Sequence, residues 1–284
     1  MNHSDLHAEA PSIAAGMAAA DHGAHVQLAQ TRHRAALVAG WDIAPGSTVL
    51  ELGCGQGDMT AVLAEAVGPG GRVVAVDVAD PSYGAPVTLG ESAERLAAGR
   101  LGPRIDFRFA TDVLDPSVGF PEGAFDHVVL AHCSWYFSSL GRLRDTLARV
   151  RPWARRLCFA EWDLTPGSGD RLAHLLAVLI QGQAEAAGSR GEGNVRTPFS
   201  RERLLRILPR AGWTAEACGP VDTDGLQDGD WEVAACLELL AAPERLAALS
   251  EPVRQLVLSQ ADVLRAVAEP QGNRALAAYA LTAR

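Results

Sequence analysis

The sequence predicts an α/β fold built on a doubly wound, mostly parallel sheet. Apolar strand-like runs alternate with helix-like runs between about residues 48 and 161, a pattern typical of parallel strands joined by right-handed crossovers. A glycine-rich turn, Gly53 to Gly57, directly follows the first of these strands. An acidic residue, Asp77, lies at the end of the second. These three observations together indicate a sheet edge that binds a nucleotide-like ligand.

Apolar periodicity and turn residues place the elements of the first half of the chain. Residues 1–44 are predicted to form a helical cap, in which residues 1–12 are frayed and the remainder forms two helices. Strands and helices are then expected to alternate. The predicted helices are Ile13–Ala20, Val26–Gly40, Met59–Val67, Glu91–Ala98 and Leu140–Val150, and the predicted strands are Thr48–Leu52, Arg72–Val78, Ile105–Ala110, Phe125–Leu130 and Arg156–Glu161.

The pattern changes after Asp163, where helical segments outnumber strands. Segments near 168–195 and 228–269 are expected to be helical lid insertions in a domain that spans residues 45–284. The expected helices here are Asp170–Ala187, Ser200–Ala211, Trp231–Ala242 and Glu251–Ala268, and the expected strands are Trp213–Val221 and Arg274–Thr282.

Composition excludes several classes of protein. The formal net charge of −9 over 284 residues argues against nucleic acid as a partner, because phosphate contacts require a basic surface. The five cysteines are scattered without a CxxC pair, which is typical of a reducing compartment and argues against a cysteine-based zinc site. No apolar stretch is long enough to span a bilayer. The sequence therefore predicts a cytoplasmic protein with no membrane partner.

The spacing of the glycine-rich turn distinguishes between possible ligands. The pattern is Glu51-x-Gly53-x-Gly55-x-Gly57, and Asp58 occupies the position at which a dinucleotide fingerprint has its third glycine. This pattern resembles the first motif of class I S-adenosylmethionine-dependent methyltransferases. The resemblance covers about residues 45–165 and is nearest to the ubiquinone/menaquinone C-methyltransferase-like small-molecule group. It implies a seven-stranded, Rossmann-like sheet that ends in an antiparallel pair.

The resemblance also implies a cofactor, S-adenosyl-L-methionine, with S-adenosyl-L-homocysteine as product. Asp77 corresponds to the acidic residue that binds both ribose hydroxyls in the family. Asp112 corresponds to the residue that accepts a hydrogen bond from the adenine amine, and Val113 to the one that packs on the ring. Asp77 as a solvated strand-end residue and Asp112 as a helix N-cap are the alternatives. The predicted cofactor-binding residues are Glu51, Gly53, Cys54, Gly55, Gly57, Asp77, Val78, Thr111, Asp112, Val113 and His132.

The loop after the fourth strand, Ala131 to Tyr136, is expected to face the transferred methyl group. His132 and Tyr136 are the predicted catalytic residues, and His132 is the general base. A histidine hydrogen-bonded within the loop is the alternative. The predicted substrate-binding residues are Trp135, Tyr136, His22 and Trp162. The alternative for Trp135 and Tyr136, given equal weight, is that they only pack against the rest of the protein. No metal is expected, since paired carboxylates are missing at this loop and the N-terminal histidines lack a fourth zinc ligand.

The sequence therefore predicts a metal-independent methyltransferase that acts on a small, apolar, aromatic acceptor, in secondary metabolism. C-methylation of an electron-rich ring such as indole is preferred. The alternatives are O- or N-methylation and a protein that binds S-adenosylmethionine without transferring a methyl group. A nicotinamide-dependent oxidoreductase is disfavoured, because Asp58 replaces the third glycine of the dinucleotide motif. A chain without lysine also cannot supply a Tyr-x-x-x-Lys pair. A homodimer stays open.

Overall fold

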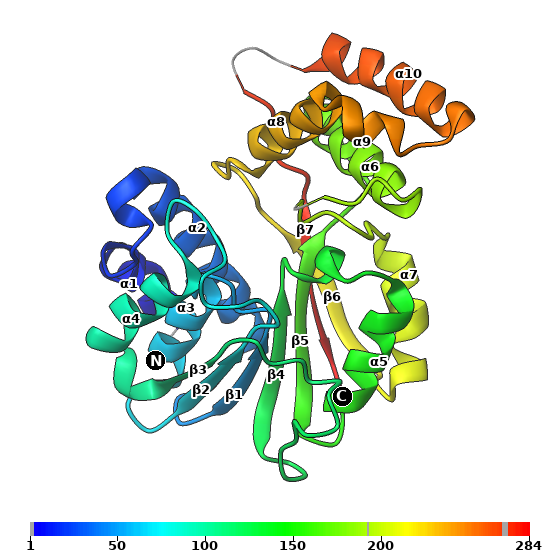
Figure 1. Ribbon diagram of the computed structural model, residues 1–284. Helices are drawn as coiled ribbons and strands as arrows, with labels where there is room; N and C mark the ends of the chain where they lie inside the picture. Colours follow the sequence, from blue (N-terminus) through cyan, green and yellow to red (C-terminus); the bar gives the residue numbers. More distant parts are fainter. Residues whose placement is uncertain (1–2, 192, 269–271) are drawn as a thin grey trace.

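The computed structural model of the protein describes residues 3–191, 193–268 and 272–284. Its centre is a seven-stranded sheet in the order β3-β2-β1-β4-β5-β7-β6 (Figure 1). The first five strands run parallel, and β7 lies antiparallel between β5 and β6. The predicted doubly wound, mostly parallel sheet is therefore confirmed. The strands are β1 (Thr48–Leu52), β2 (Arg72–Val76), β3 (Ile105–Arg108), β4 (Phe125–Ala131), β5 (Ala154–Trp162), β6 (Ala215–Val221) and β7 (Ala278–Ala283).

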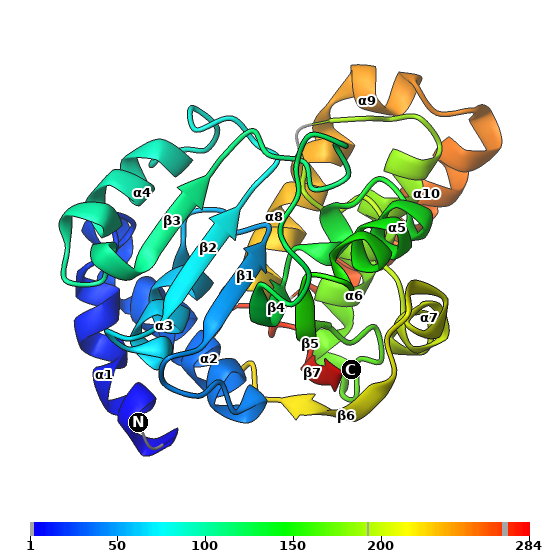
Figure 2. The same cartoon turned by 90° about the horizontal axis from the view of Figure 1, so that it is seen from below.

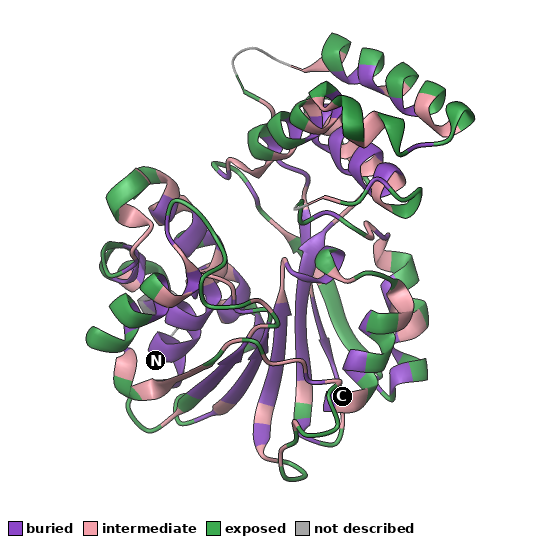
Figure 3. Cartoon of the chain, viewed as in Figure 1, coloured by how far each residue is buried: buried purple, intermediate pink, exposed green. Residues whose placement is uncertain are grey.

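Helices cover both faces of this sheet (Figure 2). Successive residues of a strand point to opposite faces, so that Val49 joins one hydrophobic core and Leu50 the other. Strands β1, β2, β4, β5 and β7 are buried along most of their length, whereas the edge strands β3 and β6 are more exposed (Figure 3). The first core packs α1 (His3–Ala15), α2 (Ala20–Trp41), α3 (Asp58–Val67) and α4 (Leu89–Ala98) on the sheet, and the second packs α5 (Leu140–Val150) and α7 (Arg201–Ile207).

Four further helices form a separate bundle beyond the end of β5 (Figure 1). This bundle, called the lid here, has its own hydrophobic core, to which Ile180, Cys236 and Leu264 contribute. The lid stands over the carboxyl ends of the parallel strands (Figure 1). Open α/β sheets bind their ligands at this end. Its helices are α6 (Leu172–Ala186), α8 (Asp228–Ala241), α9 (Pro243–Ala247) and α10 (Glu251–Val267).

The predicted N-terminal helices are wrong in their boundaries. Residues 3–12, predicted to be frayed, lie in α1, because Leu6, Ala10 and Ile13 form a buried stripe at helical spacing. Residues 1 and 2 lie outside the described residues. The break between the two helices, expected at residues 21–23, lies instead at residues 16–19, within the predicted helix Ile13–Ala20. A second interruption falls inside α2 at Gly23, whose φ of 178° and ψ of 74° are not helical.

Several other boundaries differ from the predictions. The last strand begins at Ala278 and not at residue 274, because residues 274 to 277 connect the lid to the sheet. Helix α7 ends at Ile207, and a 3-10 turn follows over Pro209–Ala211, since Pro209 has no N–H to continue the helix. Helix α9 was not predicted. The end of the predicted lid insertion at residue 269, and residue 192 within the other, lie outside the described residues.

Candidate functional site

The glycine-rich turn after β1 leaves an open space beside its middle residue. Gly53, Gly55 and Gly57 all have positive φ, at 72°, 51° and 88°, a conformation that other residues rarely adopt. A Cβ at Gly53 would lie 2.8 Å from Cys133, and one at Gly57 would lie 2.7 Å from Leu96. A Cβ at Gly55 would meet no described protein atom within 4 Å. The outer glycines therefore allow close packing within the protein, whereas Gly55 faces space that a ligand can fill.

Asp77 follows β2 and is held against this turn. Its Oδ2 accepts a hydrogen bond of 2.9 Å from the Gly55 N–H, and its Oδ1 accepts one of 2.9 Å from the Ala79 N–H. A carboxylate oxygen has more than one lone pair, so both oxygens can still accept hydrogen bonds from a ligand. The neighbouring Val78 is 68% exposed. A fixed acceptor and an exposed apolar side chain therefore lie side by side at the edge of the open space.

Glu51 lies below the turn, at the end of β1. Its side chain is 2% exposed and accepts a 2.6 Å hydrogen bond from the Thr60 hydroxyl. Burial raises its pKa to about 8, opposed by that hydrogen bond. Cys54 is also buried, and burial raises the pKa of its thiol, so this cysteine is not a nucleophile.

The predicted adenine-binding residues form the loop after β3. The Asp112 carboxylate accepts a 3.0 Å hydrogen bond from the Leu114 N–H and pairs with Arg142. No helix begins within this described loop, so the N-cap alternative for Asp112 is wrong. Val113 is buried, and the Thr111 hydroxyl donates to the Phe109 carbonyl. Thr111 and Asp112 thus shape the loop through local hydrogen bonds.

His132 lies at the end of β4 in a left-handed conformation, with a φ of 53°. Its N–H continues the sheet by donating to the Ala160 carbonyl at 3.0 Å. Its Nε2 lies 2.9 Å from Nε2 of His33 on α2, and its Nδ1 lies 3.6 Å from Oε1 of Glu161 at the end of β5. His33, His132 and Glu161 are called the histidine network below.

The histidine network is buried, and burial sets its protonation. Burial lowers the pKa of His132 to about 3, helped by the positive charge of Arg34. Burial, His132 and Arg34 lower the pKa of His33 to about 2. Burial raises the pKa of Glu161 to about 7, against hydrogen bonds from Ser134 and the Trp162 N–H. Both histidines are therefore neutral, and Glu161 titrates near neutral pH.

The predicted aromatic wall divides into buried and exposed members. Trp135 is 2% exposed and belongs to the core between the sheet and α5, as the packing alternative expects. Tyr136 is 44% exposed. The Trp162 ring lies 4.5 Å from that of His132, measured between centroids. His22 is exposed and precedes the break at Gly23, so it does not share a continuous helical face with His33.

Two residues that matter here, Arg34 and Asp228, were not singled out from the sequence. Arg34 lies close enough to affect the pKa of Glu51, His33 and His132. Its guanidinium hydrogen-bonds Gln30, which in turn donates to Asp228 of α8 at 2.8 Å. Among the described residues, no carboxylate pairs with Arg34. No sequence signal marked it, because α2 carries arginines at both Arg32 and Arg34 and only the fold shows which one faces the sheet.

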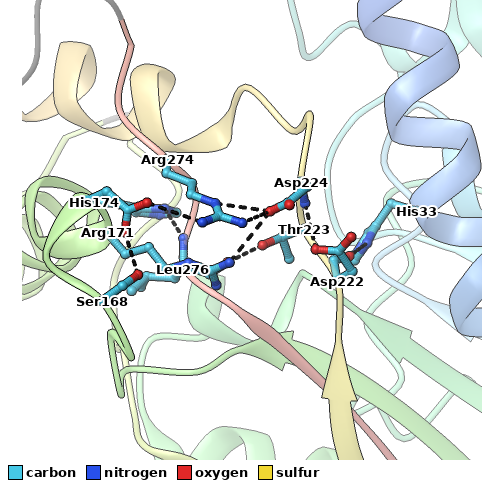
Figure 4. Close-up of polar contacts among 10 residues, drawn as sticks. His33, Ser168, Arg171, His174, Asp222, Thr223, Asp224, Arg274 and Leu276 are labelled. Carbon is cyan, nitrogen blue, oxygen red and sulfur yellow. Dashed lines mark hydrogen bonds and ion pairs between the residues drawn. The ribbon is translucent and has the colours of Figure 1, made fainter.

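Figure 4 shows how the base of the lid meets α2. His33 donates from Nδ1 to the Asp222 carbonyl at 3.0 Å, and the next residue, Thr223, donates to the Leu276 carbonyl at 2.9 Å. Arg274 pairs with Asp224. His174 of α6 accepts a 2.9 Å hydrogen bond from the Leu276 N–H. The segment 222–224 is therefore tied both to α2 and to the lid.

Within the described ranges, no group of three or more histidine, cysteine, aspartate or glutamate side chains is arranged to hold a metal ion. The helices of the described ranges are also too short or too polar to cross a lipid bilayer.

The chain is similar to known methyltransferases. Residues 49–155 match the family model described as "Methyltransferase domain". A cyclopropane-fatty-acyl-phospholipid synthase-like protein from Lactobacillus casei is 33% identical, with a TM-score of 0.85 over 97% of this chain and 98% of that one. The methyltransferase phomM' of Diaporthe leptostromiformis is 31% identical over 60% of this chain and 54% of its own length. The nocamycin O-methyltransferase of Saccharothrix syringae is 38% identical over 40% of this chain and 38% of its own length. The chain thus matches about half the length, or less, of these two curated relatives.

Proposed function

Because the chain belongs to the class I S-adenosylmethionine-dependent methyltransferases, we propose that it transfers the methyl group of S-adenosylmethionine to a small-molecule acceptor. The single observation that carries this proposal is the open space beside Gly55, a residue whose N–H is hydrogen-bonded to Asp77. A side chain at position 55 would fill the space that the cofactor needs. The residues present therefore fit the cofactor of the family.

Each part of the cofactor has a matching group in this chain. Asp77 has lone pairs left for both ribose hydroxyls, and the exposed Val78 offers an apolar contact to adenine, with Asp112 at its amine. Val113 packs in the hydrophobic core next to Asp112. The methionine carboxylate is negatively charged, and Arg34 supplies a positive charge close to Glu51. We assign Arg34 to this carboxylate. When bound, the sulfonium supplies an activated methyl group, so the protein has to align the acceptor and exclude water.

The acceptor side of the site is apolar and aromatic. Tyr136 is half-exposed and offers aromatic surface, whereas Trp162 is buried and packs against the His132 ring. Such surfaces bind flat, apolar molecules. In the transfer, the bond from the methyl carbon to sulfur breaks as a bond to the acceptor forms. S-adenosylhomocysteine leaves, and the acceptor loses one proton to water, after the transfer in the case of a ring carbon and before it in the case of a phenol.

The histidine network supports C-methylation of an electron-rich ring such as indole over O-methylation. His132 Nε2 is hydrogen-bonded to His33, and His132 Nδ1 is buried against Glu161. His132 therefore does not present a free nitrogen that could deprotonate a phenol before transfer. A ring carbon needs no such deprotonation, because its proton is lost after the methyl group has been attached. The O-methyltransferase relative supports the alternative, although it matches only 40% of this chain.

Methyl-labelled S-adenosylmethionine, incubated with the protein and an extract of small molecules, tests the proposal. We expect label in a low-molecular-weight product, and NMR of that product identifies the methylated atom. A methyl group on oxygen or nitrogen would overturn the preference for carbon but not the transfer. If S-adenosylhomocysteine binds in calorimetry while no product is labelled, the chain is a cofactor-binding protein without transfer activity. Failure of both measurements would refute the assignment of the pocket.

A further inference from the structure

The hydrogen bonds of the histidine network determine where its protons lie. A carbonyl oxygen can only accept, so His33 must donate from Nδ1 to the Asp222 carbonyl, 3.0 Å away. Since His33 is neutral, its Nε2 then carries a lone pair. The 2.9 Å contact between the two Nε2 atoms needs one hydrogen, which must come from His132. Neutral His132 therefore carries its lone pair at Nδ1.

This lone pair of His132 faces a carboxyl group. Nδ1 of His132 lies 3.6 Å from Oε1 of Glu161 and has no hydrogen-bond partner, although it is buried. Glu161 cannot turn away, because Ser134 donates to its Oε2 from both N–H and hydroxyl, at 3.0 and 2.6 Å, and the Trp162 N–H donates to its Oε1 at 3.1 Å. Two lone pairs that face each other in a buried site repel, whereas one proton between them removes the repulsion.

The other end of the network is fixed to the lid. The Asp222 carbonyl that His33 contacts belongs to a segment held by Thr223 through the Leu276 carbonyl and by Asp224 through Arg274 (Figure 4). Leu276 in turn donates its N–H to His174 of α6. His33 is therefore in contact with the base of the lid on one side and with the loop after β4 on the other.

We propose that His33 is a positioning residue, which couples the base of the lid to the loop after β4 and fixes the tautomer of His132 with its lone pair at Nδ1 toward Glu161. In this arrangement the lone pair at His132 Nδ1 faces Oε1 of Glu161 at 3.6 Å, and the proton of this buried pair resides on the Glu161 carboxyl group. The role in catalysis rests on the methyl-transfer function proposed above, but the tautomer does not depend on turnover.

The tautomer can be measured directly by NMR of the full chain labelled with ¹⁵N-histidine, with and without S-adenosylhomocysteine. We expect His132 to show a protonated Nε2 and an unprotonated Nδ1. His33→Leu removes the acceptor for the Nε2 proton and should release this tautomer. His33→Gln should keep it, because its side-chain carbonyl accepts from His132 while its amide donates to Asp222. His25→Ala, an exposed histidine of the same helix, is the matched control.

A protonated Nδ1 in the unmodified protein, or an unchanged tautomer in His33→Leu, would overturn the proposal. If His33→Leu does not fold, the unmodified protein and His33→Gln still decide it. In the labelled-methyl assay we expect His33→Leu to reduce the transfer rate about ten-fold or more, because the loop after β4 is no longer held in a fixed position. Its affinity for S-adenosylhomocysteine should stay within about two-fold, and His33→Gln should restore most of the rate. Equal rates in all variants would contradict the positioning role. If even the unmodified protein transfers no methyl group, the proposed function fails while the tautomer result stands.

Discussion

The cofactor cradle, made of the turn Gly53–Gly57 and Asp77, and the histidine network lie at the same sheet edge but are assembled differently. In the cradle, Gly55 and Asp77 contact each other across 22 residues of sequence, within one strand–helix–strand unit. In the network, His33 lies 99 residues from His132 and 189 from Asp222. The cradle depends on backbone conformation, whereas the network depends on four separate segments packing correctly. A local sequence motif therefore identifies the first but not the second.

The largest effect is expected inside the cradle, where two neighbouring glycines should behave differently. Gly53→Ala combines a positive φ with a Cβ only 2.8 Å from Cys133, and should destabilise the fold by roughly 2–5 kcal/mol. Gly55→Ala, which meets open space, should cost only about 1–2 kcal/mol from its backbone. Urea unfolding measures both. S-adenosylhomocysteine titration should show weaker binding in Gly55→Ala, and equal destabilisation by the two variants would contradict the distinction.

A second prediction concerns the histidine network and the way in which the stability of the protein changes with pH. The folded-state pKa of Glu161 is raised by burial to about 7 from 4.5. Between these values the unfolded chain loses the proton first, so the folded state becomes less stable as pH rises, by roughly 3 kcal/mol in total. Glu161→Gln cannot titrate, so its stability relative to the unmodified protein should rise over this range. Above about pH 7 the difference should level off.

Urea unfolding at a series of pH values between 4 and 8 measures this difference. Glu122→Gln, an exposed carboxylate in the loop before β4, is the matched control and should not reproduce the rise. If the free energy of unfolding of Glu161→Gln also differs from that of the unmodified protein by a constant amount over this pH range, Glu161 does not hold an additional proton in the folded state. The proton that the proposal places on the Glu161 carboxyl group would then be excluded as well.

A third prediction returns to the cradle and concerns binding alone. Asp77→Ala leaves two ribose hydroxyls without an acceptor and should weaken S-adenosylhomocysteine binding by about 1–3 kcal/mol. Asp80→Ala, which removes a charge three residues further along the same loop, is the control. Calorimetry measures both dissociation constants. An unchanged constant in Asp77→Ala would refute the ribose assignment, and an equal loss in Asp80→Ala would point to a general effect of charge.

The sequence was sufficient to predict the strands of the sheet, because most of them are apolar runs between turn residues. β1 and α5 have the boundaries that periodicity predicted. The sequence was not sufficient for the acceptor side. His33 and His25 look alike along α2, and only the packing of α2 on the sheet buries one and exposes the other. The contact between Glu161 and His132 likewise depends on the register between β4 and β5.

The smallest effect is expected outside the cradle, at Asp112, the predicted contact of the adenine amine. Arg142 of α5 pairs with Asp112, and both side chains are more than one third exposed, so the pair should contribute less than about 1 kcal/mol to stability. Arg142→Ala should therefore leave unfolding nearly unchanged and alter S-adenosylhomocysteine affinity by less than about two-fold. Asp112→Ala should weaken binding by about 1 kcal/mol, because the adenine amine loses its acceptor. Equal losses in the two variants would mean that Arg142 is needed to hold Asp112 in place. The adenine contact would then depend on a distant segment, as the histidine network does.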